Sequence, residues 1–472
     1  MKMIESARAA WLSGAAQRSR RRRFKDFTYG RQWGDYCRST DGRRMTERQR
    51  MEEEGRIPIT NNIIRQMVKS IVGRYRYLSV QASMKEGEAP LGMLARALEG
   101  SAGEQADIDA RSLEEFLISG TVIQRLGEER AEAVSLERFF YRPFTRSDGS
   151  DCRLMGMLHD MSPAEVIARF AGGDPRRAAA VKEAFGRESG AGHSLFASEG
   201  EGNIEFDRPS MQGTWRVVEL WEKVGSEWLE VYDPFTRVTG FEEPEALGRL
   251  EALNRARKSV GSEPLEWEHV ARECWRERWL APDGTLIKET RGGEPPFVMR
   301  FYPMIDGEVH SLVEDVVDQQ KYVNRLISLL DHIISSSAKG VLLYPSDQLP
   351  DGFTWRDLRR IWSTPNGIMP YKRTARGVSP EQVHTGSAVG AGAADMLRTQ
   401  LQLFEEISGS TGALRGSSAS AAGEGMFRAE LENATISLLD VLAAFRAFIR
   451  QRDVEMDAIR VYNENDRNYA ES

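Results

Sequence analysis

One long helical pattern at residues 311–338 constrains this chain more than any other feature of its sequence. Ser311 and Glu314 match a capping box at its start, and Gly340 follows its end. At 1.5 Å per residue the helix would span about 40 Å, which is long for a single globular core. The pattern favours a helical bundle or a wall shared between subunits, and a buried helix of a monomer is the alternative. The apolar positions are Leu312, Val316, Val323, Leu326, Ile327, Leu330 and Ile333.

Length and composition predict a folded protein of several parts. The chain has 472 residues, and about 150 residues per domain gives roughly three structural units. Apolar residues make up 40% and Trp occurs ten times, which suffices for a real core. Apolar runs stay short of the roughly 18 residues that a membrane-spanning helix needs. Residues 1–10 are charged and lack the apolar centre of a secretory signal, so we expect a protein made and used in a cytoplasm.

The motifs of catalysis and of cofactor binding are missing from the sequence. The three cysteines are far apart, and the six histidines form neither an HExxH motif nor a close pair. Glycine-rich segments lack the Gly-Lys-Ser/Thr ending of a phosphate-binding loop, and GxSxG does not occur. We therefore expect no catalytic residue, no metal site and no cofactor, and predict that the protein is not an enzyme.

Positive charge is concentrated near the N-terminus. The net charge is −7, yet residues 17–50 hold twelve Lys or Arg against four Asp or Glu. The arginine run is either an interaction surface, such as one for nucleic acid, or a solvated helix face, and both readings stay open. For the interleaved aromatic residues we favour docking on the protein's own core over base stacking. The run consists of Arg20, Arg21, Arg22 and Arg23, and the aromatics are Phe24, Phe27, Tyr29, Trp33 and Tyr36.

Periodicity elsewhere predicts an α+β fold that is mainly helical. A helix should begin at Pro163, capped by Ser162 with Glu165 at its third position, and break near 172–175. Gly225 and Ser226 separate two β-rich runs and suggest a hairpin. We further expect helices at 60–78 (capped by Thr60 or Asn61), 89–118, 162–186, 244–258, 355–362, 391–408 and 426–462. Strands are expected at 122–126, 139–142, 214–224, 227–232, 270–279, 341–344 and 368–371.

A strand pair around the turn Pro282-Asp283-Gly284 carries an alternating row of arginines. Trp and Arg are over-represented among interface hot spots, so this row is a candidate docking surface. The alternative is a strand pair packed within the protein. The candidate residues are Trp275, Arg276, Arg278 and Trp279.

Residues 408–425 form a stretch of Gly, Ser and Ala between two helices, with Arg415 as the only charge before Glu424. Long loops of this kind are usually functional or disordered. We expect either a mobile functional loop or a linker.

Five segments, in order along the chain, resemble the portal proteins of tailed double-stranded DNA phages, particularly those of short-tailed phages. The most specific is the spacing Asp318-x-Gln320-x-x-x-Asn324-x-x-x-Ser328. The others are Gly30-Arg31-Gln32-Trp33, the helix 61–76, the segment 362–368, and Ser408-Gly409 followed by Gly416. The resemblance covers about residues 24–439 with gaps, and is weakest in the β-rich insert.

The resemblance implies a ring, expected to be a dodecamer, that conducts DNA through a channel at one capsid vertex of the virion. The implied partners are further copies of the chain, the major capsid and scaffolding proteins, the terminase large subunit, the tail adaptor and double-stranded DNA bound without sequence preference, with no membrane. Assembly is expected in the host cytoplasm. Another ring or adaptor protein of the head–tail junction is the alternative, and a nucleic-acid-processing enzyme is a third possibility.

The implied parts can be placed on the sequence. We expect a wing at 1–160 containing the basic arm 17–50, a first stem helix at 161–194, a β-rich clip at 195–300, a second stem helix at 301–339, the rest of the wing with the channel loop (408–425) at 340–425, and a crown at 426–472. Asp318, Gln320, Asn324 and Ser328 are assigned to the stem and ring interface. Ser408, Gly409, Arg415 and Gly416 are assigned to the DNA-channel loop, and Trp275, Arg276, Arg278 and Trp279 to terminase docking on the clip.

Overall fold

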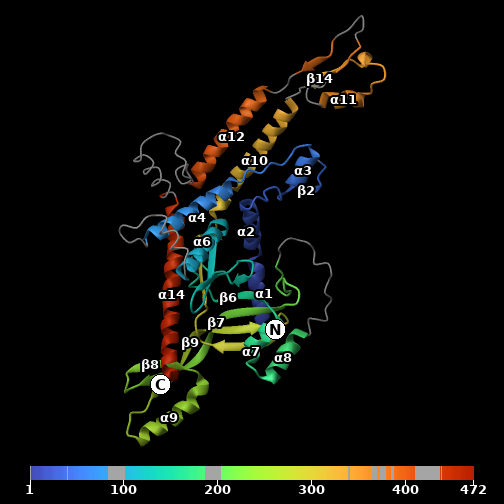
Figure 1. The fold of residues 1–472 in the computed structure, drawn as a ribbon. Helices are drawn as coiled ribbons and strands as arrows, with labels where there is room; N and C mark the ends of the chain where they lie inside the picture. Colours follow the sequence, from blue (N-terminus) through green and yellow to red (C-terminus); the bar gives the residue numbers. More distant parts are fainter. Residues whose placement is uncertain are drawn as a thin grey trace. The chain divides into compact units, whose positions relative to one another are not determined.

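The computed structural model describes residues 2–39, 41–82, 101–186, 204–337, 341–363, 369–372, 379–383, 387–409, 436 and 438–471 (Figure 1). The chain forms two compact units. The first unit comprises Met1–Arg23, Val72–Leu312 and Leu438–Ser472, and the second comprises Phe24–Ile71 and Val313–Ser437. Each unit is therefore built from segments far apart in the sequence.

The chain contains both helices and antiparallel sheets, which agrees with the predicted α+β class. The α-helices are α1 Lys2–Ser13, α2 Ala15–Thr28, α3 Glu47–Glu53, α4 Ile63–Ala82, α6 Ser101–Ser119, α7 Pro163–Ala171, α8 Pro175–Gly186, α9 Leu247–Ser259, α10 Leu312–Ser337, α11 Trp355–Ser363, α12 Ser387–Ser408 and α14 Leu439–Glu471. Short 3₁₀ helices are η1 Pro244–Ala246 and η2 Ser346–Gln348.

The strands are short except for two. They are β1 Tyr36–Arg38, β2 Arg44–Thr46, β3 Thr121–Leu126, β4 Ala131–Ala133, β5 Phe139–Tyr141, β6 Leu154–Met161, β7 Trp215–Asp233, β8 Val238–Glu242, β9 Glu266–Leu280, β10 Leu286–Arg291, β11 Phe297–Phe301, β12 Pro303–Ile305, β13 Glu308–Val309, β14 Val341–Leu343 and β15 Glu381–Val383. Residues 89–100 and 426–435, which belong to two predicted helices, lie outside the described residues.

The first unit is organised around a six-stranded antiparallel sheet with the order β10-β9-β7-β6-β5, in which β8 also pairs with β7. A three-stranded sheet with the order β11-β3-β4 accompanies it. The predicted hairpin at Gly225 and Ser226 is wrong. Both residues continue the 19-residue strand β7, where they pair with Glu273 and Arg272 of β9. The long ladder to β9 satisfies the backbone across the Gly-Ser pair, so the chain has no reason to turn there.

Aromatic side chains fill the cores of the first unit. In one cluster Phe139 meets Phe297 edge to face, with 5.2 Å between ring centroids, and Phe144 meets Phe301 at 4.9 Å. In another, α7 and α8 cover the sheet, and Phe185 stacks on Trp215 at 4.6 Å. Such contacts combine large buried apolar area with the offset or edge geometries that aromatic rings prefer.

The region predicted as a first stem helix, 161–194, contains two short helices in its described part. α7 begins as expected: Ser162 accepts a hydrogen bond from the Glu165 backbone, Glu165 caps the Ser162 backbone in return, and Pro163 takes the first position. It ends at Gly172, whose φ of +55° favours glycine. α7 has 9 residues and α8 has 12, so neither forms a long stem.

The segment predicted as a separate clip, 195–300, is not a separate domain. β7 pairs with β6 from Leu154↔Glu222 to Met161↔Trp215, so its strands continue the sheet of the predicted wing. β11 likewise pairs with β3. Hydrogen bonding across the predicted boundaries at 160 and 195 makes one sheet of both regions, because each strand needs a neighbour to satisfy its backbone.

The second unit places a two-stranded sheet between two long helices. β14 pairs with β15 in antiparallel register from Val341↔Val383 to Leu343↔Glu381. The strand predicted at 368–371 is wrong in its described part, because residues 369–371 carry no strand and β15 supplies the partner instead. α4 is capped by Asn62, whose Oδ1 accepts from the Arg65 backbone at 3.0 Å, in place of the predicted Thr60 or Asn61.

Candidate functional site

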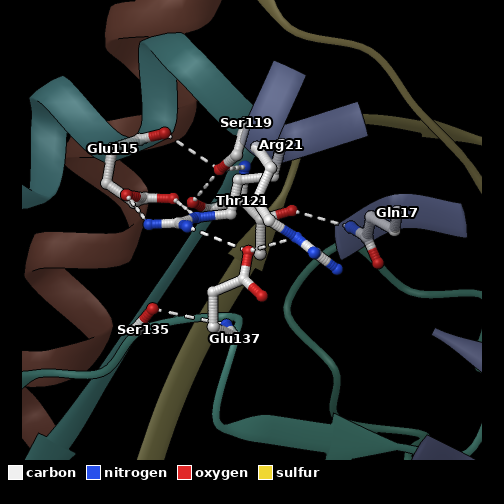
Figure 2. A network of polar contacts seen from close by, with 8 residues as sticks. Gln17, Arg21, Glu115, Ser119, Thr121, Ser135 and Glu137 are labelled. Atoms are coloured by element: carbon white, nitrogen blue, oxygen red, sulfur yellow. Dashed lines mark hydrogen bonds and ion pairs between the residues drawn. The ribbon is translucent and has the colours of Figure 1, made fainter. Parts of the chain in front are cut away.

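The arginine run of α2 is held by carboxylates of the first unit. Figure 2 shows the Arg21 guanidinium between two of them: Nη2 lies 2.7 Å from Glu115 Oε2 and Nη1 lies 3.3 Å from Glu137 Oε1. Arg22 Nε is 3.4 Å from the same Glu137 oxygen. Burial alone would lower the pKa of Arg21, but hydrogen bonds and charge attraction from the two carboxylates outweigh it and raise the pKa. Arg21 is therefore a buried structural cation.

The predicted exposure of this run holds only in part. Arg21 is buried, while Arg20, Arg22 and Arg23 are half-buried and each has an interaction partner. Thus neither a fully solvated face nor an open four-arginine surface describes the run. The buried Arg21 cannot serve as a capsid or DNA contact without unfolding this network.

Three of the five interleaved aromatic residues dock on the protein's own core, as favoured above. Phe24, Phe27 and Trp33 are buried. Tyr29 and Tyr36 are exposed, and each has an arginine over its ring: Arg65 lies 4.4 Å from the Tyr29 centroid and Arg44 lies 4.1 Å from that of Tyr36.

The predicted exposure of the docking residues on β9 is wrong. Trp275, Arg278 and Trp279 are buried, with 7%, 5% and 1% of their surface exposed, and the Arg276 side chain is half-buried. The cationic row is neutralised from the neighbouring strands. Arg278 bonds to Glu222 at 2.7 Å and to Glu289 at 2.8 Å, and Arg276 approaches Glu289 at 3.6 Å. The arginine row seen in the sequence faces a matching row of glutamates, which sequence spacing alone does not reveal.

The polar positions of α10 also point inward. Gln320, Asn324 and Ser328 recur every four residues on one helix face, and all three are buried within the second unit. The expectation that they form a ring interface is therefore wrong for these three, since the chain itself covers them. Asp318 is exposed, so its assignment to the interface stays a prediction.

These inward side chains bind the backbone that leads into α4. Gln320 Oε1 accepts from the Ile63 backbone at 2.9 Å, and Asn324 Oδ1 accepts from the Asn61 backbone at 3.0 Å. Ser328 Oγ accepts from the Ile59 backbone at 3.0 Å. The resulting network (Ile59, Asn61, Ile63, Gln320, Asn324, Ser328, Gln32), here called the amide network, joins three of the segments that carry the portal resemblance.

Gln32 completes the amide network from the Gly30-Arg31-Gln32-Trp33 segment. Its Oε1 accepts from Asn324 Nδ2 at 2.6 Å, and its Nε2 donates to the Phe27 carbonyl at 2.6 Å. Both amide ends of Gln32 are therefore used, as expected of a buried polar group.

Sequence reasoning missed a charge cluster on the same helix. Lys321 Nζ lies 2.7 Å from Asp35 and 2.9 Å from Glu47, and Arg325 lies 2.8 Å from Glu47. Lys321 and Arg325 are four residues apart on α10, which places them on one face. That spacing was the available signal, but only the fold shows which carboxylates meet them.

The strand pair β14–β15 closes a loop between α10 and α12. α10 ends at Ser337 and β14 begins at Val341, while β15 ends at Val383 and α12 begins at Ser387. Because Val341 and Val383 are partners in the ladder, the chain leaves one helix and enters the next through a single narrow neck. Residues 341–383 therefore form an insert between two long helices, and this segment is called the insert below.

The described part of the insert presents aromatic and cationic side chains. Phe353, Trp355 and Tyr371 are exposed, and Arg356 and Arg359 project from α11. Thr354 caps α11, because its Oγ1 accepts from the Asp357 backbone at 3.3 Å. The same hydroxyl donates to Asp357 Oδ2 at 2.6 Å, and this bond lowers the pKa of Asp357. Buried Leu358 and the edge contact of Trp355 with Tyr344 fix the helix.

α12 has a buried face and an exposed apolar stripe. Ala393 and Phe404 are buried. Met396, Leu403 and Ile407 are exposed and lie within about 40° of one another around the helix at 100° per residue. They form what we call the α12 stripe. Three large apolar side chains in a row on one exposed face indicate a contact surface.

α12 ends where the predicted channel loop begins. Ser408 is its last residue and is buried, so it belongs to the helix rather than to an open loop. Gly409 follows with a φ of +62°, as is typical after a helix C-terminus. Arg415 and Gly416 lie outside the described residues.

A comparison with protein families tests the resemblance to phage portal proteins. A family model described as "Phage P22-like portal protein" matches residues 128–456, more than two thirds of the chain. The chain belongs to this family. Comparison with curated proteins gave no match. Portal-family proteins are structural components of the phage head and are located at a capsid vertex, so the resemblance inferred from the motifs is confirmed.

The described part of this portal-family chain lacks two kinds of feature. Among the residues with defined positions, no group of three His, Cys, Asp or Glu side chains is arranged to hold a metal ion. Across the same residues, none of the helices combines the length and apolarity that crossing a membrane requires.

Proposed function

We propose that this portal-family protein assembles with copies of itself into a closed ring, expected to be a dodecamer, that conducts double-stranded DNA at the capsid vertex. Major capsid and scaffolding proteins would surround the ring during assembly in the host cytoplasm. Terminase would dock on it for packaging, and the tail adaptor would follow. The observation that carries the proposal is the pair of long helices joined by the insert, in a chain of the portal family.

The α12 stripe supports ring formation. Exposing Met396, Leu403 and Ile407 to water is unfavourable by about 25 cal/mol per Å² of apolar surface. Covering them with a neighbouring copy therefore stabilises the contact between the two copies. A ring requires each subunit to present two different faces, because the contacts are head to tail. Asp318 on α10 is the candidate on the second face.

Native mass spectrometry tests the ring. The wild type should give one closed oligomer, and the triple variant Met396→Ser/Leu403→Ser/Ile407→Ser should shift toward monomer. Leu401→Ser is the matched control, since Leu401 is exposed on the same helix but about 140° from Met396 at 100° per residue. A wild-type protein that stays monomeric at micromolar concentration and low salt would contradict the proposal.

We place the stem on α10 and α12 and the clip on the insert, instead of on 161–194 and 195–300. The support is that α10 and α12 have 26 and 22 residues and enclose the insert at one neck. Trp355 and Arg359 are then the candidate terminase contacts, since exposed Trp and Arg are typical anchors. They replace Trp275, Arg276, Arg278 and Trp279, which are buried or ion-paired.

Binding to purified terminase tests the clip. Trp355→Ala and Arg359→Glu should each weaken terminase binding while rings still assemble. Arg276→Glu serves as the comparison on β9. Terminase binding that is lost with Arg276→Glu and unchanged with the two α11 variants would return the docking surface to β9.

We propose that the segment after Gly409, with Arg415 and Gly416, contacts DNA in the channel. Small residues allow several copies to crowd around an axis, and one arginine per copy would give weak phosphate contacts without sequence preference. Deletion of residues 417–422 should leave procapsids assembled but package or retain DNA poorly. Normal packaging and retention would instead indicate a linker.

We further propose that the protein has no catalytic activity or cofactor of its own, since a portal acts by holding and passing DNA. Incubation of pure protein with DNA and Mg²⁺ tests this. Cleavage that co-purifies with the ring would overturn it.

A further inference from the structure

A small cavity of about 220 Å³ in the first unit gathers three basic side chains from three elements. Arg125 comes from β3, His159 from β6 and Arg169 from α7. Ala133, Val134 and Met157 give it an apolar wall. Its volume lies below the roughly 300–1,000 Å³ typical of clefts for drug-sized ligands, so it suits a single side chain.

A buried carboxylate lies beside this cavity and is fully engaged. Glu219 has no exposed surface, and its Oε2 lies 2.7 Å from His159 Nε2 and also pairs with Arg125. Its Oε1 accepts from Trp221 Nε1 at 3.0 Å. Burial alone would raise the pKa of Glu219, but His159 and Arg125 outweigh it and lower the pKa. One negative charge is thus shared between two basic groups.

Arg169 is the third basic group at the same cavity. Its guanidinium lies over Trp279, 4.3 Å from the ring centroid, and ion pairs to it are absent from the described residues. Partial burial and the nearby charge of Arg125 lower the pKa of Arg169 and outweigh the attraction of Glu219 and Glu277, which acts in the opposite direction. The surroundings therefore disfavour the charged form of Arg169, and an oxyanion bound against its guanidinium would relieve that cost.

We infer that this cavity binds the carboxylate of an acidic peptide segment from another protein, with Arg169 as its principal ligand. The apolar wall fits the short aliphatic stem of a Glu or Asp side chain. Exposed Glu132 also lines the cavity. Its negative charge repels the polyanionic backbone of a nucleic acid more strongly than it repels a single carboxylate. The inference does not depend on ring formation or on DNA conduction.

Isothermal titration calorimetry at fixed ionic strength tests it, with glutarate, inorganic phosphate and a short DNA duplex as separate probes. Glutarate should bind saturably, and Arg169→Gln should weaken it by about tenfold or more, as expected for loss of a charge-assisted hydrogen bond. Arg176→Gln is the control, because Arg176 is exposed on α8, near α7, and does not line the cavity. Arg169 is itself exposed, so its variant should melt like the wild type.

Each other outcome overturns the inference. Absence of saturable glutarate binding, or equal binding by wild type and Arg169→Gln, removes the site. Phosphate or duplex binding that is tighter than glutarate binding and is lost in Arg169→Gln assigns the cavity to a nucleic-acid phosphate instead.

Discussion

At the scale of single residues, buried arginines of the first unit form ion pairs with carboxylates that are far away in the sequence. Arg21 reaches Glu115 and Glu137, which lie 94 and 116 residues further along the chain. Arg452 of α14 pairs with Asp109 of α6. Removing one member of a buried pair costs more than the pair itself contributes, because the remaining charge stays buried without a partner.

Arg21→Gln should therefore destabilise the first unit by about 3–5 kcal/mol, as expected when one side of a buried pair is lost. Urea denaturation followed by Trp fluorescence measures the change. Arg176→Gln, an exposed change, should stay within about 0.5 kcal/mol of the wild type. Equal effects of the two variants would contradict the structural role of Arg21.

Cys152 is predicted to be the least reactive of the three thiols. Burial raises the pKa of Cys152 to about 11, with hydrogen bonds from its Sγ to the Leu154 and Arg142 carbonyls. The thiolate is the nucleophile, and only a minute fraction of the Cys152 side chain is ionised near pH 8, so Cys152 should react slowly. Mass spectrometry after iodoacetamide treatment should show the half-buried Cys37 and Cys274 alkylated first, and all three alkylated in urea. Equal rates in the native protein would be inconsistent with this burial.

Sequence pattern located these residues but could not assign their partners. The run Arg20 to Arg23 is plain in the sequence, yet Glu115 and Glu137 are two of 71 acidic residues. Which carboxylate meets which arginine depends on the tertiary fold. The same applies to β9, where the glutamates that neutralise Arg278 lie on β7 and β10.

At the scale of elements, side-chain amides of α10 hydrogen-bond the backbone at the start of α4 and just before it. Gln320→Ala would leave the Ile63 and Ile64 N–H groups and the Asn61 carbonyl without their amide partner. Each unpaired buried group costs about 1–3 kcal/mol. We expect a clear loss of thermal stability, measured by calorimetry. His332→Ala, at an exposed position of the same helix outside the proposed ring contact, is the control. A Gln320→Ala protein that melts with the control would show that water replaces the amide.

Helices were predicted well where the sequence contains both a capping motif and an apolar periodicity. The capping box of α7 and the bounds of α10, expected at 311–338 and found at Leu312–Ser337, follow from caps and periodicity. The hairpin at Gly225 failed because a glycine permits a turn but does not require one. Fifteen residue pairs with β9, from Val218 to Tyr232, keep the strand continuous.

At the scale of the whole molecule, the last helix completes a core begun hundreds of residues earlier. Phe445 of α14 lies 5.4 Å from Tyr75 and 5.9 Å from Phe116, measured between ring centroids, and both Phe445 and Phe448 are fully buried. The first unit is therefore not encoded by any contiguous fragment.

A chain truncated after residue 438 should lose the native packing of the first unit. Losing one buried Phe costs about 3–5 kcal/mol, and the truncation removes two together with Arg452. Near-UV circular dichroism and limited proteolysis measure the loss. Deletion of 463–472 alone is the milder control. A truncated protein with native near-UV signal would show that α14 is dispensable.

Family membership followed from short motifs, but the division into parts did not. The longest β-rich stretch, 195–300, resembled an inserted clip, and only strand pairing with β6 shows that it completes a larger sheet. The insert at 341–383 is small and weakly patterned, and its position between two long helices becomes evident only when β14 meets β15.

The narrow neck at Val341 and Val383 has an evolutionary consequence. A segment attached through one strand pair can be lengthened, shortened or exchanged by recombination without disturbing the helices on either side, because its ends already lie together. Chimaeras that graft a foreign 341–383 segment at this neck should retain the rest of the fold. On the proposed assignment of the clip to the insert, adaptation to a new motor or a new tail requires changes in this one exchangeable segment.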